Sequence, residues 1–550
     1  MDINSVEYET KRLDHLGIVA GLCHEIGLVE TINEMLNKEK GKDSERKVSC
    51  GTAVLAMILN GLGLTSRALY LMPEYMENKP IKLLTGEDLD ASDFNDDSLG
   101  RALDELYALG ITEVFAEIVQ TAIKIYKLDV DFAHTDTSSL SLTGRYDGIP
   151  EEDANLVKIT HGYSKDHRPD LKQIVVTLVT SQQGRIPLWL EVLDGNSSDK
   201  ISLRETVNAY CEHLTEGEEP WFVMDSAAYT ATNIADWGTE KKWLTRVPES
   251  IKEAQIALQS VKTEDMNLLS RGYAIHSTNS SYSDIEQRWL VVYSEQAEKR
   301  ELKRLDKQVT RAAHNLEKAL KKLHKQEFAC KKDAENAVLR LRKKLNWHVV
   351  EPTYQPIEKH SKQGRPPKGA KPDIVAWQIQ ATYQLDTQHV EEKQQTLGRF
   401  LLATNELDAQ SLSDETMLNC YKEQGTTVER GFRFFKDPLF FAHSLFLESP
   451  ARIMAMTMIM GLCLLIYSLA EYQLRQKLKE NDETIPDQKG TPTQTPTMRR
   501  VAQIFEGVDL LIIRYGGIIV KQQILKLSTT RSKIIQLFSP TIHNYYVFDD

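Results

Sequence analysis

The chain has 550 residues, of which 41% are hydrophobic and 27% charged, enough for about three or four domains with buried cores. Its six scattered cysteines form no CxxC pair, which argues against a disulfide framework or a zinc site and fits a reducing cytosol. The formal net charge of −12 counts against a uniformly basic nucleic-acid binder, so such contacts would need a local concentration of positive charge. The N-terminus is too charged for a secretory signal peptide.

Residues 1–128 are predicted to be helical. Apolar residues recur at helical spacing in residues 48–62 and 98–109, and Asn95 stands before the second of these, where a helix-capping residue is expected. This pattern is typical both of a DNA-binding or assembly domain and of a plain helical scaffold.

A run of short strands is predicted to follow. The β-prone segments are residues 128–139, 173–180, 186–193, 221–224 and 242–247. Residues 199–214 are helix-like, and a turn containing Gly184 joins the second and third strands as a hairpin. Three strands, a helix, a strand, a helix and a strand form the order of an RNase H-like α/β fold. We therefore expect a mixed five-stranded sheet with flanking helices.

Residues 251–396 are predicted to interrupt this core as an insertion domain. A strand pair at residues 273–275 and 288–293 precedes a long charged segment, residues 295–344. Leucines in that segment fall at spacings typical of helices, which predicts a helical hairpin or a coiled coil.

Positive charge is concentrated in the insertion. Residues 298–344 contain 16 Lys and Arg but only 7 Asp and Glu. Such a basic face is typical of a DNA-binding surface and equally of an ordinary solvated face. Residues 361–372, around Gly-Arg-Pro, have the composition of an arm for a minor groove or of a simple linker.

The core is predicted to resume with a strand at residues 399–404 and helices at 413–435 and 449–479. Residues 453–470 are uncharged and long enough for a membrane span, but they lack aromatic belts on both sides, which favours a buried core helix. A polar linker and a small apolar tail complete the chain. The resulting domain boundaries are 1–128, 129–250, 251–396, 397–480 and 481–550.

Three carboxylates stand where a metal site is expected in such a fold. Asp136 lies within the first strand segment, Asp225 directly follows the 221–224 strand, and Glu429 lies in a later helix. A carboxylate on a central strand is costly unless it is paired or binds metal, and hard cations such as Mg²⁺ prefer oxygen ligands. Asp131 competes with Asp136, but the two point to opposite faces of the strand.

Four segments carry a resemblance to a known family. They are HTDTSSLSLTG (134–144), HGYSKDHRPDLKQIVV (161–176), WFVMDSAAYT (221–230) and YKEQGTTVERGFRFFK (421–436). Together they resemble the motif set of DDE transposases of the IS-four-type insertion-sequence superfamily, in a subgroup of larger chains with an extended insertion before the catalytic glutamate. The resemblance implies that Asp136, Asp225 and Glu429 are the catalytic metal ligands.

The resemblance also implies DNA-contacting residues. Lys436 keeps the family's six-residue gap from Glu429, whereas Tyr421 is one residue farther away than in the motif and Gln424 stands at the Arg position. Arg433 shares a helix face with Glu429 and Lys436 and is expected to hold phosphates with Lys436. The polar segment that contains Lys165, Arg168 and Lys172 is expected to be a loop that contacts DNA or a solvated turn.

The expected activity is cut-and-paste transposition, in which two Mg²⁺ or Mn²⁺ ions assist DNA strand cleavage and strand transfer. The expected partners are double-stranded DNA, with terminal inverted repeats and a target, and a second copy of the chain in a paired-end complex. No membrane is expected, and the expected location is the bacterial or archaeal cytosol. The alternatives are an RNase H-like nuclease without strand transfer and a catalytically inactive, transposase-derived DNA-binding protein.

Overall fold

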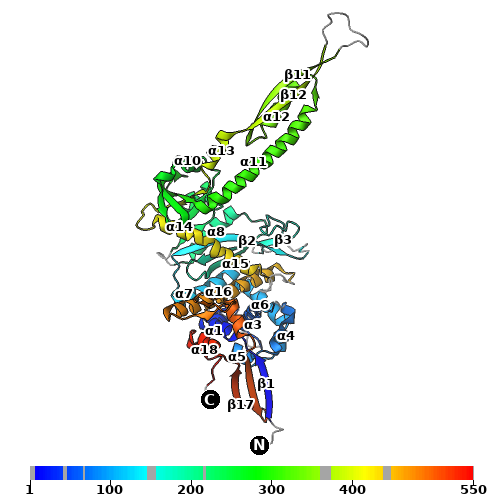
Figure 1. Cartoon of the computed structure of the whole chain (residues 1–550). Helices are drawn as coiled ribbons and strands as arrows, with labels where there is room; N and C mark the ends of the chain where they lie inside the picture. Colours follow the sequence, from blue (N-terminus) through cyan, green and yellow to red (C-terminus); the bar gives the residue numbers. More distant parts are fainter. Residues whose placement is uncertain are drawn as a thin grey trace, which may run out of the picture. The chain divides into compact units, whose positions relative to one another are not determined.

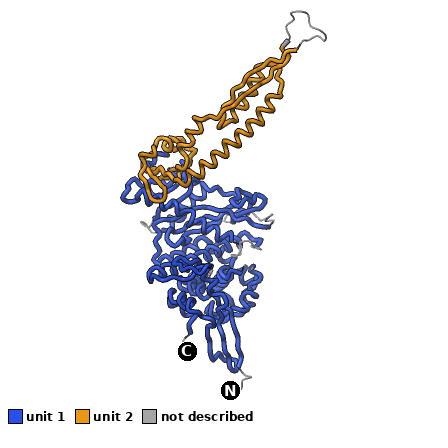
Figure 2. Tube along the Cα trace, in the orientation of Figure 1, with its two compact units in different colours: residues 1–245, 281–287, 404–550 blue, residues 246–280, 288–403 orange. Residues whose placement is uncertain are grey.

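The computed structural model divides into two compact units, which are described separately here. Unit 1 contains residues 1–245, 281–287 and 404–550, and unit 2 contains residues 246–280 and 288–403 (Figure 2). The structure describes residues 6–40, 46–65, 68–144, 146, 156–214, 219–359, 373–437 and 447–548. The proposed minor-groove arm at 361–372 therefore lies outside the described residues.

Unit 1 is built on a mixed sheet with strand order β4-β3-β2-β5-β6. Strand β2 pairs antiparallel with β3, and β3 pairs antiparallel with β4. On its other side β2 pairs parallel with β5, which in turn pairs parallel with β6. The strands are β2 (Phe132–Leu142), β3 (Lys172–Ser181), β4 (Pro187–Leu193), β5 (Trp221–Met224) and β6 (Trp243–Val247). The predicted strands and their order along the chain are confirmed, whereas the predicted number of five is too low for the hydrogen-bonded sheet, which has nine strands in the described part of the chain.

Helices cover both faces of this sheet (Figure 1). One face, which contains Leu178 of β3 and Leu190 of β4, packs against α7 (Ile111–Tyr126), α15 (Val428–Phe435) and α16 (Pro450–Glu480). Gly461 of α16 permits this packing, since a Cβ atom there would lie 2.5 Å from the Leu190 side chain. The opposite face packs against α8 (Asp199–Glu212), which is followed after β5 by α9 (Ala231–Trp237).

The N-terminal part forms a helical layer around α16. Its helices bury apolar residues against one another. They are α1 (Leu16–Glu25), α2 (Leu28–Lys40), α3 (Cys50–Leu62), α4 (Met72–Glu77), α5 (Ile81–Thr85) and α6 (Asp96–Leu109), which precede α7. Of these, α1, α3 and α6 also pack against α16. Asn95 caps α6 by accepting a hydrogen bond from the Ser98 amide, as its position predicts.

Helix α16 is long and apolar enough to cross a membrane, with a mean hydropathy of 2.2 over its most apolar window. Among the described helices, two bent pairs, α1 with α2 and α6 with α7, are also long and apolar enough to cross a membrane if each pair is taken as one span. The apolar window of α16 is 100% buried inside the protein, in agreement with the predicted core helix.

A three-stranded antiparallel sheet joins the two ends of the chain. Strand β1 (Val6–Arg12) pairs with β16 (Asp509–Tyr515), which pairs with β17 (Ile518–Leu525). The prediction of an all-helical N-terminal part is therefore wrong at β1, because its polar sequence gives no strand signal until a distant strand pairs with it. The C-terminal part also contains β14 (Ile485–Pro486), β15 (Pro492–Thr493), α17 (Met498–Phe505), α18 (Thr529–Gln536) and α19 (Pro540–His543).

Unit 2 contains a small sheet with the order β13-β9-β8-β7 and a long helix-and-hairpin arm. In the arm, α11 and α12 pack on the β11–β12 hairpin through Leu316, Leu320 and Val338. The predicted helical hairpin is therefore corrected: the leucine stripe of α11 faces a β-hairpin, and spacing alone does not specify its partner. The elements are α10 (Lys252–Ser260), β7 (Asn267–Leu269), β8 (Tyr273–Tyr282), β9 (Ile285–Ser294), α11 (Glu295–His324), β10 (Glu327–Phe328), α12 (Lys331–Arg342), β11 (His348–Lys359), β12 (Asp373–Leu385), α13 (Thr387–Gln394) and β13 (Arg399–Thr404).

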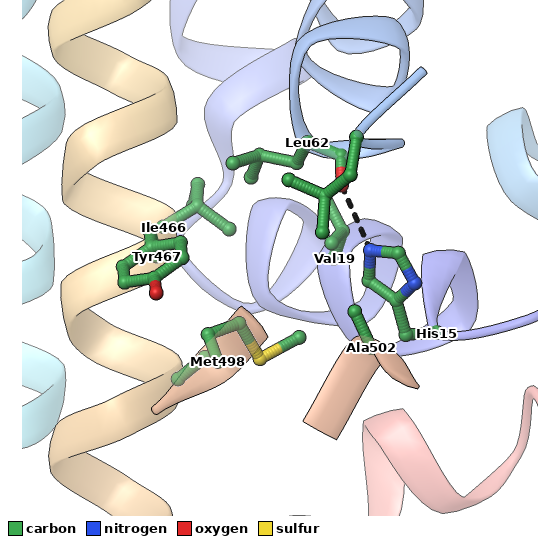
Figure 3. Close-up of a pocket in the computed structure, with 9 residues that line it drawn as sticks. His15, Val19, Leu62, Ile466, Tyr467, Met498 and Ala502 are labelled. Carbon is green, nitrogen blue, oxygen red and sulfur yellow. Dashed lines mark hydrogen bonds between the residues drawn. The ribbon is translucent and has the colours of Figure 1, made fainter. Parts of the chain in front are cut away.

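A buried histidine lies in an apolar pocket of the helical layer (Figure 3). The His15 ring is 2.8 Å through Nε2 from the carbonyl oxygen of Leu62, with Val19, Ile466 and Met498 around the pocket. Burial lowers the pKa of His15 from 6.5 to about 4. The ring is therefore neutral at pH 7 and donates its Nε2–H to the carbonyl.

His15 predicts a dependence of stability on pH. Between pH 6.5 and 4 the unfolded chain binds the histidine proton and the folded chain does not, so stability is present above pH 6.5 and is lost as the pH falls toward 4. The expected loss is about 3 kcal/mol, since one pKa unit corresponds to about 1.4 kcal/mol. Chemical denaturation across this range should show a shallower loss for His15→Gln than for the wild type. Equal losses of stability in His15→Gln and the wild type would contradict this prediction. The control is His161→Gln, which replaces an exposed histidine of unit 1 and should behave like the wild type.

Candidate active site

Asp136 stands on the central strand of the unit 1 sheet. Because side chains alternate along a strand, Asp136 shares its face with His134 and Ser138, whereas Thr137 points to the α8 face. The cross-strand partner of Asp136 is Leu178, so this is the face covered by α15 and α16. The Asp136 carboxylate is partly buried and accepts a hydrogen bond of 2.7 Å from the Thr137 amide.

Asp225 stands beside Asp136 at the end of the adjacent parallel strand. The register pairs His134 of β2 with Val223 of β5, and the two aspartates lie two residues beyond these partners. Asp225 begins the turn after β5, where its side chain accepts a hydrogen bond of 2.8 Å from the Ala227 amide. Its carbonyl accepts a hydrogen bond from Thr245 of β6. The parallel pairing therefore brings two of the predicted carboxylates to the same level of the sheet.

The charges around Asp136 alter its acidity. Burial, together with the charges of the Asp225 and Asp199 carboxylates, raises the pKa of Asp136 to about 6, against the opposing effect of the Lys165 ammonium. Desolvation and the nearby like charges both disfavour the ionised form of Asp136, and a cation bound beside the carboxylate would offset both effects.

Lys165 supplies a cation between the acids. Its Nζ lies 3.7 Å from Asp136 Oδ1 and 3.2 Å from Asp199 Oδ2, and it donates a hydrogen bond of 2.7 Å to the Thr137 carbonyl. Asp199, the first residue of α8, also accepts a hydrogen bond from the Thr137 hydroxyl. The sequence prediction placed Lys165 on a DNA-contacting loop and did not include Asp199, whose only signal is its position at a helix start.

The segment that carries Glu429 is hydrogen-bonded to β2 on both sides of Asp136. On the N-terminal side of Glu429, the buried Gln424 side chain lies 2.7 Å from His134 Nδ1 and donates a hydrogen bond to the Thr135 carbonyl. On its C-terminal side, Lys436 donates a hydrogen bond of 2.8 Å to the Ser138 hydroxyl and forms an ion pair of 2.7 Å with Asp166. The predicted 413–435 helix is therefore broken here into α14 (Asp414–Glu423), a turn at Gln424–Thr426, and α15.

Glu429 itself is exposed on α15. Among the described residues, no three His, Cys, Asp or Glu side chains are grouped as metal ligands. The structure thus brings Asp136 and Asp225 together, and it places Glu429 on the helix that runs past them without joining its carboxylate to the pair. Gln424, which stands where the motif has Arg, provides a buried anchor that the sequence did not indicate.

The other predicted residues lie around this site or at its edge. Arg433 is exposed one turn after Glu429, and Tyr421 is partly exposed on α14. Arg168 forms an exposed ion pair of 2.7 Å with Asp170, so its charge is partly neutralised. Lys172, at the start of β3, donates to the carbonyl of Tyr146 at 3.3 Å.

Comparisons with known proteins find similarity to a family model and to solved structures. Residues 8–120 match a family model described as a domain of unknown function, DUF4277. None of the curated proteins compared with the chain matches it. A cryo-EM structure of the piggyBac transposase synaptic complex with hairpin DNA is similar over 91% of this chain and 82% of that chain, with 10% sequence identity and a TM-score of 0.37. At that TM-score, the similarity assigns no role to any residue of this chain.

The Gln424 anchor predicts a stability effect. Gln424→Leu keeps the size of the side chain but leaves the His134 N–H and the Thr135 carbonyl without this partner in a buried place, so it should lower the free energy of unfolding by about 1–3 kcal/mol. Urea unfolding followed by circular dichroism measures this. The same substitution at the exposed Gln410 should cost less than about 0.5 kcal/mol; similar costs at both positions would show that the anchor is not needed.

Proposed function

We propose that this chain is a transposase that cleaves DNA at the ends of a mobile element and joins the ends to target DNA with the help of divalent cations. The observation that carries the proposal is the pair Asp136 and Asp225, level with each other on adjacent parallel strands, with the Glu429 segment fastened across the same strand. Phosphodiester chemistry needs carboxylates gathered from separate elements in this way.

The architecture supports the proposal. Three antiparallel strands are followed by two strands parallel to the first, in the order β4-β3-β2-β5-β6, and we propose that they form an RNase H-like core. In open α/β sheets, ligands bind beyond the carboxyl ends of parallel strands. Asp225 stands at that end of β5.

The donor set suits Mg²⁺ or Mn²⁺. Asp136, Asp225 and Glu429 would hold the cations, which supply activation of an oxygen nucleophile and neutralisation of charge at the phosphate when bound. The crowded acids fit such a group, because burial and like charge both disfavour ionised Asp136 without a cation. The Lys165 ammonium is positively charged, as a metal cation would be, and it offsets part of the negative charge of Asp136 and Asp199 in the structure.

The chain's own residues position the DNA in this proposal. Lys436 is held by Ser138 and Asp166 at one side of Asp136, and Arg433 projects from the same helix into solvent. Both present positive charge beside the acids, which suits the phosphates that flank a scissile bond. Joining two ends requires both ends in one complex, so we propose a dimer on paired DNA ends. The basic segment of unit 2 is proposed as a further DNA contact.

Asp225→Asn tests the catalytic assignment. The substrate is a plasmid that carries the DNA flanking this gene, incubated with the purified protein and Mg²⁺ or Mn²⁺. The variant should still bind the DNA within about twofold, since phosphate contacts dominate affinity, but should lose at least about 10³-fold in cleavage rate because a metal ligand is removed. Asp131→Asn, an exposed aspartate just before β2, is the matched control and should cleave like the wild type.

The products distinguish the competing functions. Cleaved ends joined to a target plasmid support the transposase, whereas nicks that are never joined favour a nuclease of the same fold. A wild-type protein that binds the flanking DNA but never cleaves it would favour an inactive DNA-binding protein. Cleavage by Asp225→Asn at the wild-type rate would overturn the assignment.

A further inference from the structure

A second cationic site lies in unit 1, outside the acids. A cavity of 310 Å³ opens between the β3–β4 turn, the last turns of α16 and the 494–495 segment. Its charged lining consists of Arg185 from the turn, Arg475 and Lys479 from α16, and Glu423 from the end of α14. Three cations and one carboxylate therefore line an open cavity.

The nearby buried carboxylate does not cancel this excess. Glu471, whose side chain is 2% exposed, pairs with Arg430 at 2.6 Å and with Arg475 at 2.8 Å, and it also accepts the Met498 amide at 2.9 Å. Its charge is already shared between two guanidinium groups. Counting these groups together, four cations stand against Glu471 and Glu423, which leaves an excess of positive charge beside the cavity.

Among the described residues, Arg185 is the cavity arginine without a direct partner. It is partly buried, and among the residues that the structure describes it has no hydrogen-bond or ion-pair partner. Burial lowers its pKa, and the charges of Arg430 and Arg475 lower it further, against the smaller opposing effects of the Glu471 and Glu423 carboxylates. A desolvated guanidinium without a partner is costly, so the site favours the arrival of an anion.

The backbone of Arg185 is also unusual. Its φ of 58° lies in the left-handed region, where glycine is the favoured residue. The preceding Gly184 packs against Tyr472 of α16, since a Cβ there would lie 3.0 Å from the ring. The turn is thus held on α16 in a conformation that an arginine adopts at some cost, and strain of this kind concentrates at binding sites.

We propose that this cavity binds a backbone phosphate of the DNA on which the enzyme acts, through Arg185, Arg475 and Lys479. This inference rests on the proposed function. The cavity lies at the same end of β3 as Ser181: its wall residue Gln182 follows Ser181, whose cross-strand partner Ala133 lies three residues before Asp136 on β2. Ala133 and Asp136 are about 10 Å apart along the strand, the length of about three nucleotides of a DNA strand, and the cavity lies beyond Ser181. A phosphate in the cavity would fix the strand a few nucleotides from the acids.

Arg185→Gly tests the site without threatening the fold. Glycine removes the guanidinium and relieves the left-handed backbone, so thermal stability should be unchanged or higher. Lys479→Gln is the second variant. Lys477→Gln is the matched control, because it makes the same change on the same helix but faces outward, where Lys477 pairs with Glu480. Each protein is titrated with a fluorescent DNA duplex over a series of KCl concentrations, and separately with inorganic phosphate and pyrophosphate by calorimetry.

We expect Arg185→Gly and Lys479→Gln each to weaken DNA binding severalfold. Each should also make the negative slope of log affinity against log salt less steep by about 0.9, the value for one phosphate contact, whereas Lys477→Gln should change neither. If DNA binds but all slopes equal that of the wild type, the phosphate site is overturned while the proposed function stands. If DNA does not bind but phosphate or pyrophosphate does so in an Arg185-dependent way, the proposed function fails and the cavity is a site for a free phosphate. Absence of any Arg185-dependent binding overturns the site.

Discussion

Two carboxylates placed level with each other on adjacent parallel strands form the constraint around which unit 1 is arranged. The β2–β5 register sets Asp136 and Asp225 side by side, and burial together with their repulsion raises the pKa of Asp136 to about 6. A fold retains such a pair only if positive charge compensates it. In this structure Lys165 provides part of that charge, and in the proposed function divalent cations provide the rest.

The surrounding packing serves to hold this face of the sheet. Gly461 lets α16 approach β4, and the burial of α16 in the helical layer makes it the support on which α15 rests. Gln424 and Lys436 then fasten the α15 segment to β2 two residues before and two residues after Asp136. Glu429 is thereby kept near the pair, although its own carboxylate points to solvent.

The fold was largely predictable where a segment's own sequence determines its structure. Alternation and hydrophobic runs indicated β2 to β6, and the uncharged stretch indicated the core helix α16. Strand β1 was missed because it forms only through pairing with β16, some 500 residues away in sequence. The partner of α11 was mistaken because a leucine stripe fits a hairpin as well as another helix.

The site was predictable in part for the same reason. Asp136 and Asp225 could be proposed because each stands on or directly after a predicted strand, and the motif around Asp136 favoured it over Asp131. The roles of Lys165, Asp199 and Gln424 depend on contacts between segments far apart in the chain. A polar loop residue and a helix-start acid look alike at a functional site and on an ordinary surface. Only the folded arrangement distinguishes them.

The most direct test of the account is to locate Mn²⁺ by anomalous scattering in crystals of the protein bound to a DNA end. If the three carboxylates form the metal site, Mn²⁺ will lie in contact with Asp136 and Asp225, with Glu429 turned inward to join them and Lys165 moved away from Asp136. Mn²⁺ bound elsewhere, or bound between the two aspartates with Glu429 still directed to solvent, would contradict the three-carboxylate site.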